Sequence, residues 1–286
     1  MDDRHRQHRL TESERDQFER DGFFIVRNAL GEETVENLVD AADRLVARER
    51  PMYEKRGLKP HHSLNVLDFI GKDRTFLPLI DLPETFMKVV DILGWHIQLY
   101  HSHIIITPPL LDRDGPVRRR LGWHQDSGRL NQDIETEPRP RISLKVGFFI
   151  TDVSVEGRGN FHVLPGSHLK NRLEYPQDSE ANPDGATPVL VNAGDAVFFD
   201  RRLWHAAGIN TSEFTRKALF YGYSYRWLKP RDNMTVGHYM AGADDVRKQL
   251  LGASPNGGFG FTSPTDEDVP LKVWLSEHIG PEAVVR

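Results

Sequence analysis

Short apolar runs separated by turn residues are the feature that most limits how this 286-residue chain can fold. Glycine and proline separate the runs, as in Pro108-Pro109 and Pro165-Gly166, and no long helical segment lies between them. Many short strands without intervening long helices favour a sandwich or barrel over a parallel α/β sheet. The predicted strands are 97–107, 142–151, 160–164, 188–191, 196–199 and 216–225.

The segments on either side of this β-rich region have helical patterns. Near the N-terminus, Thr11 can cap a short helix, residues 23–26 form an apolar run typical of a strand, and helical spacing follows at 32–48 and 83–93. Near the C-terminus, a stretch rich in proline and glycine precedes a predicted helix around 266–279. We predict one domain, 1–286, made of a mostly helical layer (1–96), a β core (97–227) and a C-terminal extension (228–286).

Composition narrows the possible partners. The formal net charge is −5, so no basic excess supports binding to nucleic acid or to a membrane surface. No apolar run approaches about 18 residues, and the N-terminus lacks the apolar region of an export signal, which predicts a cytoplasmic protein. The chain has no cysteine, so any metal must be bound by nitrogen and oxygen atoms. We expect a small-molecule partner, and nothing indicates an oligomeric state.

A candidate metal site begins at Trp123-His124-Gln125-Asp126. In an extended segment His124 and Asp126 project to the same side, so both can bind one ion, although such a triplet often occurs by chance. About eighty residues later, the apolar run after Gly194 ends in His205. Two imidazoles and one carboxylate form the facial triad of non-haem Fe(II) oxygenases. Zinc fits the same ligands, so a zinc hydrolase stays open at this point.

Arg216 distinguishes these alternatives. It follows His205 by eleven residues and begins the next apolar run. If the chain turns back after Gly208, the guanidinium reaches the depth of the pocket, where it can bind a carboxylate through two hydrogen bonds. 2-Oxoglutarate needs such an anchor for its far carboxylate, whereas a metal-binding module does not. The other interpretation is a surface arginine paired with Glu213.

These residues resemble the phytanoyl-CoA dioxygenase (PhyH) family of Fe(II)/2-oxoglutarate-dependent oxygenases. The family pattern is H-x-D, a distal histidine, and an arginine after ten intervening residues. The segments 159–168, 194–210 and 10–26 also resemble family segments, so the similarity spans roughly residues 10–226. It implies a mainly β fold with flanking helices, a double-stranded β-helix of the jelly-roll, cupin-like type.

The resemblance also implies an activity. Fe(II) bound by His124, Asp126 and His205 would use 2-oxoglutarate and O2 as co-substrates, with ascorbate in support, and release succinate and CO2. The expected reaction hydroxylates an unactivated C–H bond of a small molecule, such as a natural-product intermediate or another metabolite. Because a carboxylate occupies the position of Asp126, hydroxylation is favoured over the chlorination of related halogenases. A non-catalytic jelly-roll metal- or ligand-binding protein, or a cupin-like metalloenzyme, is the alternative.

Two further positions bear on the co-substrate. Arg216 is expected to bind the far carboxylate of 2-oxoglutarate, and His103 lies where the family's first core strand contacts the keto acid. A core histidine with ordinary hydrogen bonds is the alternative for His103. Phytanoyl-CoA hydroxylase has a serine two residues after the distal histidine, where this chain has Ala207, so one hydrogen bond to the co-substrate is absent or comes from another group.

Strand alternation gives further expectations about the pocket. With Arg216 pointing inward, Ala218 and Phe220 should follow it. On the run after Ser143, alignment with the family places Val146 and Phe148 inward, so Lys145 should face away and be structural. The sequence does not identify the substrate. Three arginines follow the H-x-D motif: Arg129, Arg139 and Arg141. They either lie in a solvated loop or bind an anionic group of the substrate, and both interpretations are open.

Overall fold

The computed structural model describes residues 1–110, 121–174 and 181–285. In these residues one large sheet has six antiparallel strands in the order β1-β7-β4-β9-β3-β2. Its longest pair is β3 with β9, which runs from Ile97 opposite Tyr225 to Thr107 opposite Arg216. The strands are β1 (Phe23–Val26), β2 (Leu64–Leu67), β3 (Ile97–Thr107), β4 (Ser143–Phe149), β7 (Ala196–Asp200) and β9 (Arg216–Tyr225).

A smaller sheet faces the large one. Its described strands are ordered β6-β5-β8 and comprise β5 (Phe161–Val163), β6 (Thr187–Val189) and β8 (His205–Ala207). An isolated antiparallel bridge between His124 and His205 adds the H-x-D segment beside β8. Two facing antiparallel sheets with flanking helices are the mainly β, jelly-roll class predicted from the sequence.

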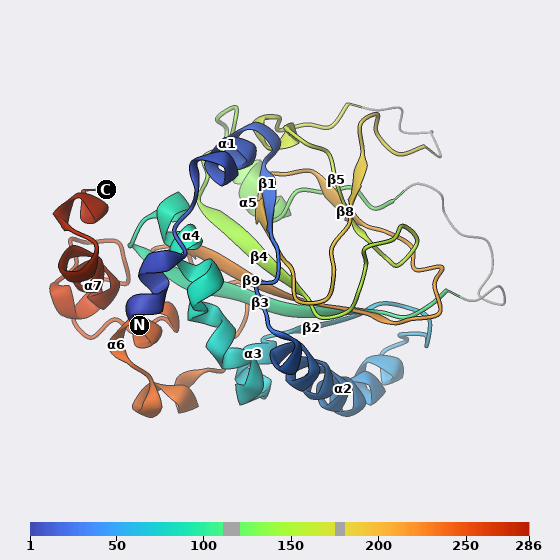
Figure 1. Ribbon diagram of the computed structural model, residues 1–286, viewed down its shortest axis with the longest axis horizontal. Coiled ribbons are helices and arrows are strands. Elements are labelled where there is room, and N and C mark those ends of the chain that lie inside the picture. The colour runs from blue at the N-terminus through green and yellow to red at the C-terminus, as the bar shows by residue number, and fades with distance from the viewer. Residues whose placement is uncertain (111–120, 175–180, 286) are drawn as a thin grey trace.

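The large sheet is buried on both faces, and its side chains alternate between two hydrophobic clusters. On one face, Val146 and Leu219 join the main cluster, which also contains helical residues such as Leu38. On the other, Phe149 and Phe220 join a second cluster with residues of the small sheet. Figure 1 shows α2 and α3 below the large sheet and β5 and β8 above it. The inner face between the two sheets is therefore separate from the helical layer.

Seven helices and several 3-10 turns complete the described chain. Thr11 caps the first helix as expected, because its hydroxyl accepts from the Glu14 amide at 3.2 Å and the Glu14 carboxylate accepts from the Thr11 amide at 2.9 Å. The helices are α1 (Glu12–Asp21), α2 (Glu32–Lys55), α3 (Phe69–Lys72), α4 (Pro83–Leu93), α5 (Gly128–Asp133), α6 (Asp245–Leu250) and α7 (Pro270–His278). The turns are η1 (Asp3–Gln7), η2 (Arg74–Asp81), η4 (Ser167–Leu169), η5 (Gly237–Gly242), η6 (Asp266–Asp268) and η7 (Pro281–Val284).

Several local features differ from the sequence prediction, and three of them have a clear physical reason. The helix expected over 32–48 extends to Lys55 and includes Pro51. Tyr53 packs against the main cluster, and this tertiary contact outweighs the hydrogen bond that proline removes. β2 and α6 have no clear sequence signal, because they contain only four and six residues and periodicity needs a longer window.

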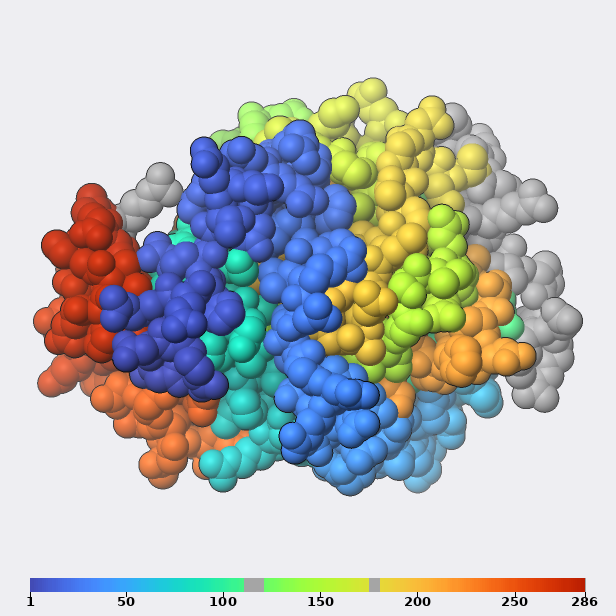
Figure 2. Space-filling view, in the orientation of Figure 1, coloured from blue at the N-terminus to red at the C-terminus, as the bar shows by residue number. Residues whose placement is uncertain are grey.

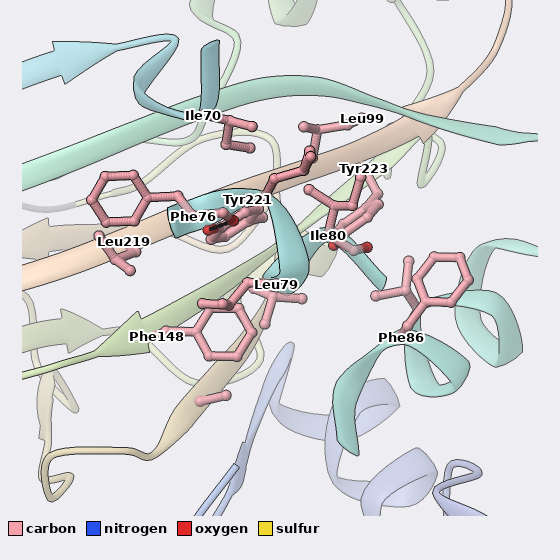
Figure 3. Packing of buried hydrophobic residues seen from close by; sticks show 14 of the residues in the cluster. Ile70, Phe76, Leu79, Ile80, Phe86, Leu99, Phe148, Leu219, Tyr221 and Tyr223 are labelled. Atoms are coloured by element: carbon pink, nitrogen blue, oxygen red, sulfur yellow. Dashed lines mark hydrogen bonds between the residues drawn. The ribbon is translucent and has the colours of Figure 1, made fainter. Parts of the chain in front are cut away.

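Two tyrosines fasten the helical layer to the large sheet. Tyr221 and Tyr223 on β9 are fully buried, and their hydroxyls donate to the carbonyl oxygens of Phe76 and Ile80 in η2, each at 2.7 Å. Figure 3 shows both rings among the side chains that join β9 to η2. Each ring thus buries a large apolar area while its hydroxyl is hydrogen-bonded to a carbonyl oxygen of η2.

The two ends of the described chain lie side by side. The rings of His5 in η1 and Trp274 in α7 meet edge to face with centroids 6.1 Å apart, and the Met1 ammonium lies 3.6 Å from Asp244. Figure 2 shows the N-terminal and C-terminal segments in contact at one end of the molecule. The C-terminal extension therefore packs on the helical layer. Among the described helices, none combines the length and apolarity needed to cross a bilayer.

Replacing Tyr221 by phenylalanine tests this attachment. The variant keeps the ring but loses the buried hydrogen bond to the Phe76 carbonyl, so we expect the free energy of unfolding to fall by about 0.5–1.5 kcal/mol. Urea denaturation measures the loss. Tyr225→Phe is the matched control, because the described structure gives the Tyr225 hydroxyl no hydrogen bond, and it should change stability by less than about 0.5 kcal/mol. Equal losses in the two variants would contradict the role of the hydroxyl.

Candidate active site

Backbone pairing brings the three predicted metal ligands together. The amide of His124 donates to the carbonyl of His205 and the amide of His205 donates to the carbonyl of His124, both at 3.0 Å. Two residues further, the Asp126 amide donates to the Arg201 carbonyl at 3.0 Å. Each of the three side chains thereby offers one ligand atom, and these atoms all lie within 4.8 Å of one another. Residues about eighty positions apart in sequence thus form one cluster.

Hydrogen bonds select the free nitrogen of each imidazole. Nδ1 of His124 lies 2.9 Å from the Gly122 carbonyl oxygen, and Nδ1 of His205 lies 2.8 Å from the Leu203 carbonyl oxygen. A carbonyl only accepts, so each Nδ1 carries the proton and each Nε2 presents its lone pair. Burial lowers the pKa of His205 to about 4, which keeps this imidazole neutral at physiological pH. Both rings are therefore ready to bind a metal ion.

Asp126 supplies a carboxylate with one free oxygen. Its Oδ1 accepts from the Lys145 ammonium at 2.8 Å, while Oδ2 is buried and has no partner among the described residues. Although burial opposes ionisation, Lys145 and the neighbouring imidazoles hold the pKa of Asp126 well below its usual range. Two imidazole nitrogens and one ionised oxygen are a donor set that fits Fe(II) or Zn(II).

The position of Lys145 corrects the sequence prediction. Lys145 was expected to face away from the pocket and Val146 and Phe148 to face inward, but the pattern is reversed. Val146 and Phe148 pack in the helix-side cluster, whereas Lys145 is 2% exposed and contacts Asp126. Alternation alone gives two sets of residues and does not say which set faces the pocket, because both faces of β4 are buried. The expectation for β9 was correct, since Ala218 and Phe220 share the inner face with the second cluster.

Arg216 is buried without a compensating acid. It is 2% exposed, and its Nη1 donates to the Gly159 carbonyl at 2.8 Å. Its Nε and Nη2 have no hydrogen-bond partner in the described part of the chain, and no acidic side chain there pairs with it. The surface pair with Glu213 is therefore not formed. Burial lowers the pKa of Arg216 to about 10, so the group still carries its charge at neutral pH.

His103 is a second buried group with unused hydrogen-bonding capacity. It is 8% exposed, and both ring nitrogens lack a partner among the described residues. It lies opposite Phe220 in the β3–β9 pair, and the two rings are 4.9 Å apart. Burial lowers its pKa well below the usual value, so the ring is neutral and can donate through one nitrogen and accept through the other. Among the described residues, His103 is therefore not the core histidine with ordinary hydrogen bonds that was the alternative.

The three arginines after the H-x-D motif have structural partners. Arg129 forms an exposed pair with Asp133, which fits a solvated loop. Arg139 donates to the Asn131 carbonyl at 2.6 Å, and Arg141 forms ion pairs with Glu19 and Asp200. Arg139 and Arg141 thus connect loops and strands, and all three guanidinium nitrogens of Arg141 are hydrogen-bonded.

Several polar groups near the cluster were not found from the sequence. The His101 and Asp232 side chains form a buried pair with Nδ1 and Oδ1 2.5 Å apart, and Tyr100 is fully buried with its hydroxyl 3.4 Å from that of Ser143. His101 could have been noticed because it precedes His103 by two residues on the same strand. Asp232 lies beyond the last core strand, in a region without a recognisable pattern.

A family model for phytanoyl-CoA dioxygenase (PhyH) matches residues 18–218 of the chain. The chain belongs to the phytanoyl-CoA dioxygenase family. This confirms the resemblance found in the sequence, and the protein is accordingly an enzyme of the dioxygenase class.

Individual relatives agree with this family and fold. An uncharacterised protein of Mycobacterium tuberculosis is 30% identical over 213 residues, 71% of this chain and 74% of the relative. Peroxisomal phytanoyl-CoA dioxygenase of Bos taurus is 25% identical over 245 residues, 73% of this chain and 67% of the relative. The crystal structure of HygX from Streptomyces hygroscopicus with nickel and 2-oxoglutarate bound has a TM-score of 0.59 at 16% identity, covering 78% of this chain and 90% of that one. The jelly-roll class is thereby confirmed.

Replacing Lys145 by methionine tests the buried pair. The Asp126 carboxylate would be left buried without its cation, so we expect the metal-free protein to lose about 3–5 kcal/mol in its free energy of unfolding. Urea denaturation in the presence of a chelator measures the loss. The double variant Lys145→Met/Asp126→Asn removes both charges and should recover part of the stability.

Lys217→Met is the matched control for this variant. Lys217 pairs with Asp43 on the other face of the sheet, and the Asp43 side chain is 58% exposed. Breaking this solvated pair should cost less than about 1 kcal/mol. Similar losses for the two lysine variants would contradict a special role for Lys145.

Proposed function

We propose that the protein is an Fe(II)/2-oxoglutarate-dependent dioxygenase that hydroxylates an unactivated C–H bond of a small molecule. The observation that carries this proposal is the unpaired, buried guanidinium of Arg216 in the same inner face as the imidazole–imidazole–carboxylate cluster. A buried cation without an anion is costly, so the site is completed when a carboxylate binds there. A zinc hydrolase or a non-catalytic binding module has no use for this second anionic position.

His124, Asp126 and His205 are the proposed ligands of the iron. Their donor set, with both Nε2 atoms and Oδ2 of Asp126 free, supports this assignment. Bound Fe(II) would supply the oxidative chemistry, in which 2-oxoglutarate, decarboxylated to succinate and CO2, and the substrate C–H bond each give two electrons to one O2 molecule. The carboxylate of Asp126 fills a position that a halide would otherwise take, which favours hydroxylation.

Arg216 and His103 are the proposed contacts of 2-oxoglutarate. Arg216 would bind the far carboxylate through Nε and Nη2, the two nitrogens that lack partners. His103 lies between Arg216 and the metal ligands along β9. It pairs with Phe220, which lies between Arg216 and Gly222, and Gly222 is opposite Lys145. Its free nitrogens can donate to the keto acid or accept from a bound water. HygX, a protein of the same fold, was crystallised with 2-oxoglutarate, which adds support.

The chain's own residues orient and protect the reaction. Phe199 and Phe220 contact His205 and His103 and exclude water from the inner face. Lys145 keeps Oδ1 of Asp126 occupied, so that only Oδ2 is offered to the metal. The proposed substrate is a natural-product intermediate or another metabolite.

Loss of an absorption band tests the metal assignment. Under anaerobic conditions, Fe(II) with 2-oxoglutarate should give a weak visible charge-transfer band in the wild-type protein, and His205→Ala should abolish it. In air with ascorbate, the wild type should also form succinate slowly without added substrate. His162→Ala is the control, because His162 on β5 is half-buried and binds the Asn160 carbonyl instead. No band and no succinate from the wild type would refute the oxygenase proposal.

Replacing Arg216 by methionine tests the co-substrate anchor. We expect the affinity for 2-oxoglutarate to fall at least about 30-fold, because a buried carboxylate would lose its cation. Titration of the charge-transfer band measures the change, with Lys217→Met as the neighbouring control. 2-Oxopentanoate lacks the far carboxylate, so the wild type should bind it much more weakly than 2-oxoglutarate, and Arg216→Met should bind both alike. Unchanged discrimination in the variant would exclude Arg216 as the anchor.

A further inference from the structure

A second polar group lies beside the proposed metal site, where the segment after β9 crosses β3. His101 and the Asp232 side chain are completely buried. Asp232 accepts from His101 Nδ1 at 2.5 Å and from the Ser102 amide at 2.6 Å. With its proton on Nδ1, His101 directs the lone pair of Nε2 outward, where Nη1 of Arg231 lies 3.4 Å away. The buried pair therefore holds the guanidinium of Arg231 in place.

The guanidinium of Arg231 is free to bind an anionic ligand. Its residue is exposed, its backbone amide donates to the Tyr100 carbonyl at 2.8 Å, and it forms no ion pair with an acidic side chain of the described chain. An arginine tethered at its backbone and at one nitrogen, with other donors free, can bind a carboxylate or phosphate at little entropic cost.

Strand register places His101, the residue that Arg231 contacts, well apart from Arg216 along the inner face of the large sheet. His101 on β3 and Lys145 on β4 are both opposite Gly222 of β9. His101 therefore lies at the same level of the sheet as Lys145, which contacts Asp126. Arg216 is six positions further along β9, roughly 20 Å at about 3.3 Å per residue. 2-Oxoglutarate bound between Arg216 and the metal, as proposed above, would span the Arg216 side of this row and leave the His101 and Arg231 side for the substrate.

The electrostatics of the pocket favour an anion on that side. Burial lowers the pKa of His103, and the charges of Lys145 and Arg231 lower it further, so the fields of both cations reach the pocket wall. Asp126 is paired with Lys145 and Asp232 with His101, and neither buried carboxylate forms an ion pair with Arg231. The charge of Arg231 is therefore available to a substrate anion.

We propose that the substrate carries a carboxylate or phosphate group, and that the exposed Arg231 binds this group while the C–H bond to be oxidised reaches toward the metal. The proposal rests on the function proposed above and adds the chemical class of its substrate. Arg231 then acts in substrate selection and takes no part in binding 2-oxoglutarate.

The test compares matched acids and neutral analogues. Carboxylic acids with their primary amides, and phosphate monoesters with their parent alcohols, are titrated by ligand-observed NMR against protein loaded with Mn(II) and 2-oxoglutarate. We expect the wild type to bind the anionic members at least about tenfold more tightly, and Arg231→Gln to lose this preference while binding the neutral members as before. Arg231→Lys should keep part of the preference, because the charge remains.

Two controls make the result decisive. Arg129→Gln removes an exposed arginine paired with Asp133 and should keep the wild-type preference, and thermal unfolding verifies that every variant is folded. If the wild type shows no preference for anions, or if Arg231→Gln keeps the preference, the inference is wrong. Uncoupled consumption of 2-oxoglutarate by the iron-loaded wild type is measured in parallel. Its absence would refute the proposed function, whereas turnover without anion preference would refute only the substrate class.

Discussion

Side-chain alternation on a sheet buried on both faces is the constraint on which the rest of this structure depends. On β9, Lys217, Leu219 and Tyr221 face the helical layer, while Arg216, Ala218 and Phe220 face the small sheet. A slip of one residue would exchange these sets, placing the Lys217 ammonium at the position of Arg216 and burying Arg216 against the helices. The tyrosine contacts with η2 oppose such a slip, so packing on the helical side maintains the site on the other side.

The inner face of the large sheet combines satisfied and unsatisfied buried polar groups. Asp126 is compensated by Lys145, so the metal-free protein can hold an ionised carboxylate 5% exposed. Arg216 has only one carbonyl partner and His103 has none in the described chain. Folding therefore bears the cost of burying these groups, and binding of ligands that complete their hydrogen bonds recovers it. The side chains of such a site are already in position before ligands bind. A bound ligand is therefore oriented without first having to rearrange the protein.

Local chemistry accounts for what could be predicted. The capped first helix, the strands at 97–107 and 216–225, and the depth of Arg216 all follow from short-range patterns or from the family's spacing. Lys145 was misplaced because a strand buried on both faces has no polar side to reveal its orientation. Asp232 could not be found, since an acidic residue in a segment without periodicity has no signal apart from its tertiary partner.

Sequence alone determined which atoms can bind a metal here, because a chain without cysteine has only nitrogen and oxygen ligands, and it determined the H-x-D spacing that puts two of them on one side of a strand. Tertiary structure decided which charges meet. Lys145 reaches Asp126 across 19 positions of sequence, and His101 reaches Asp232 across 131. These contacts depend on the register of distant strands, which the packing of both sheet faces selects and no local pattern contains.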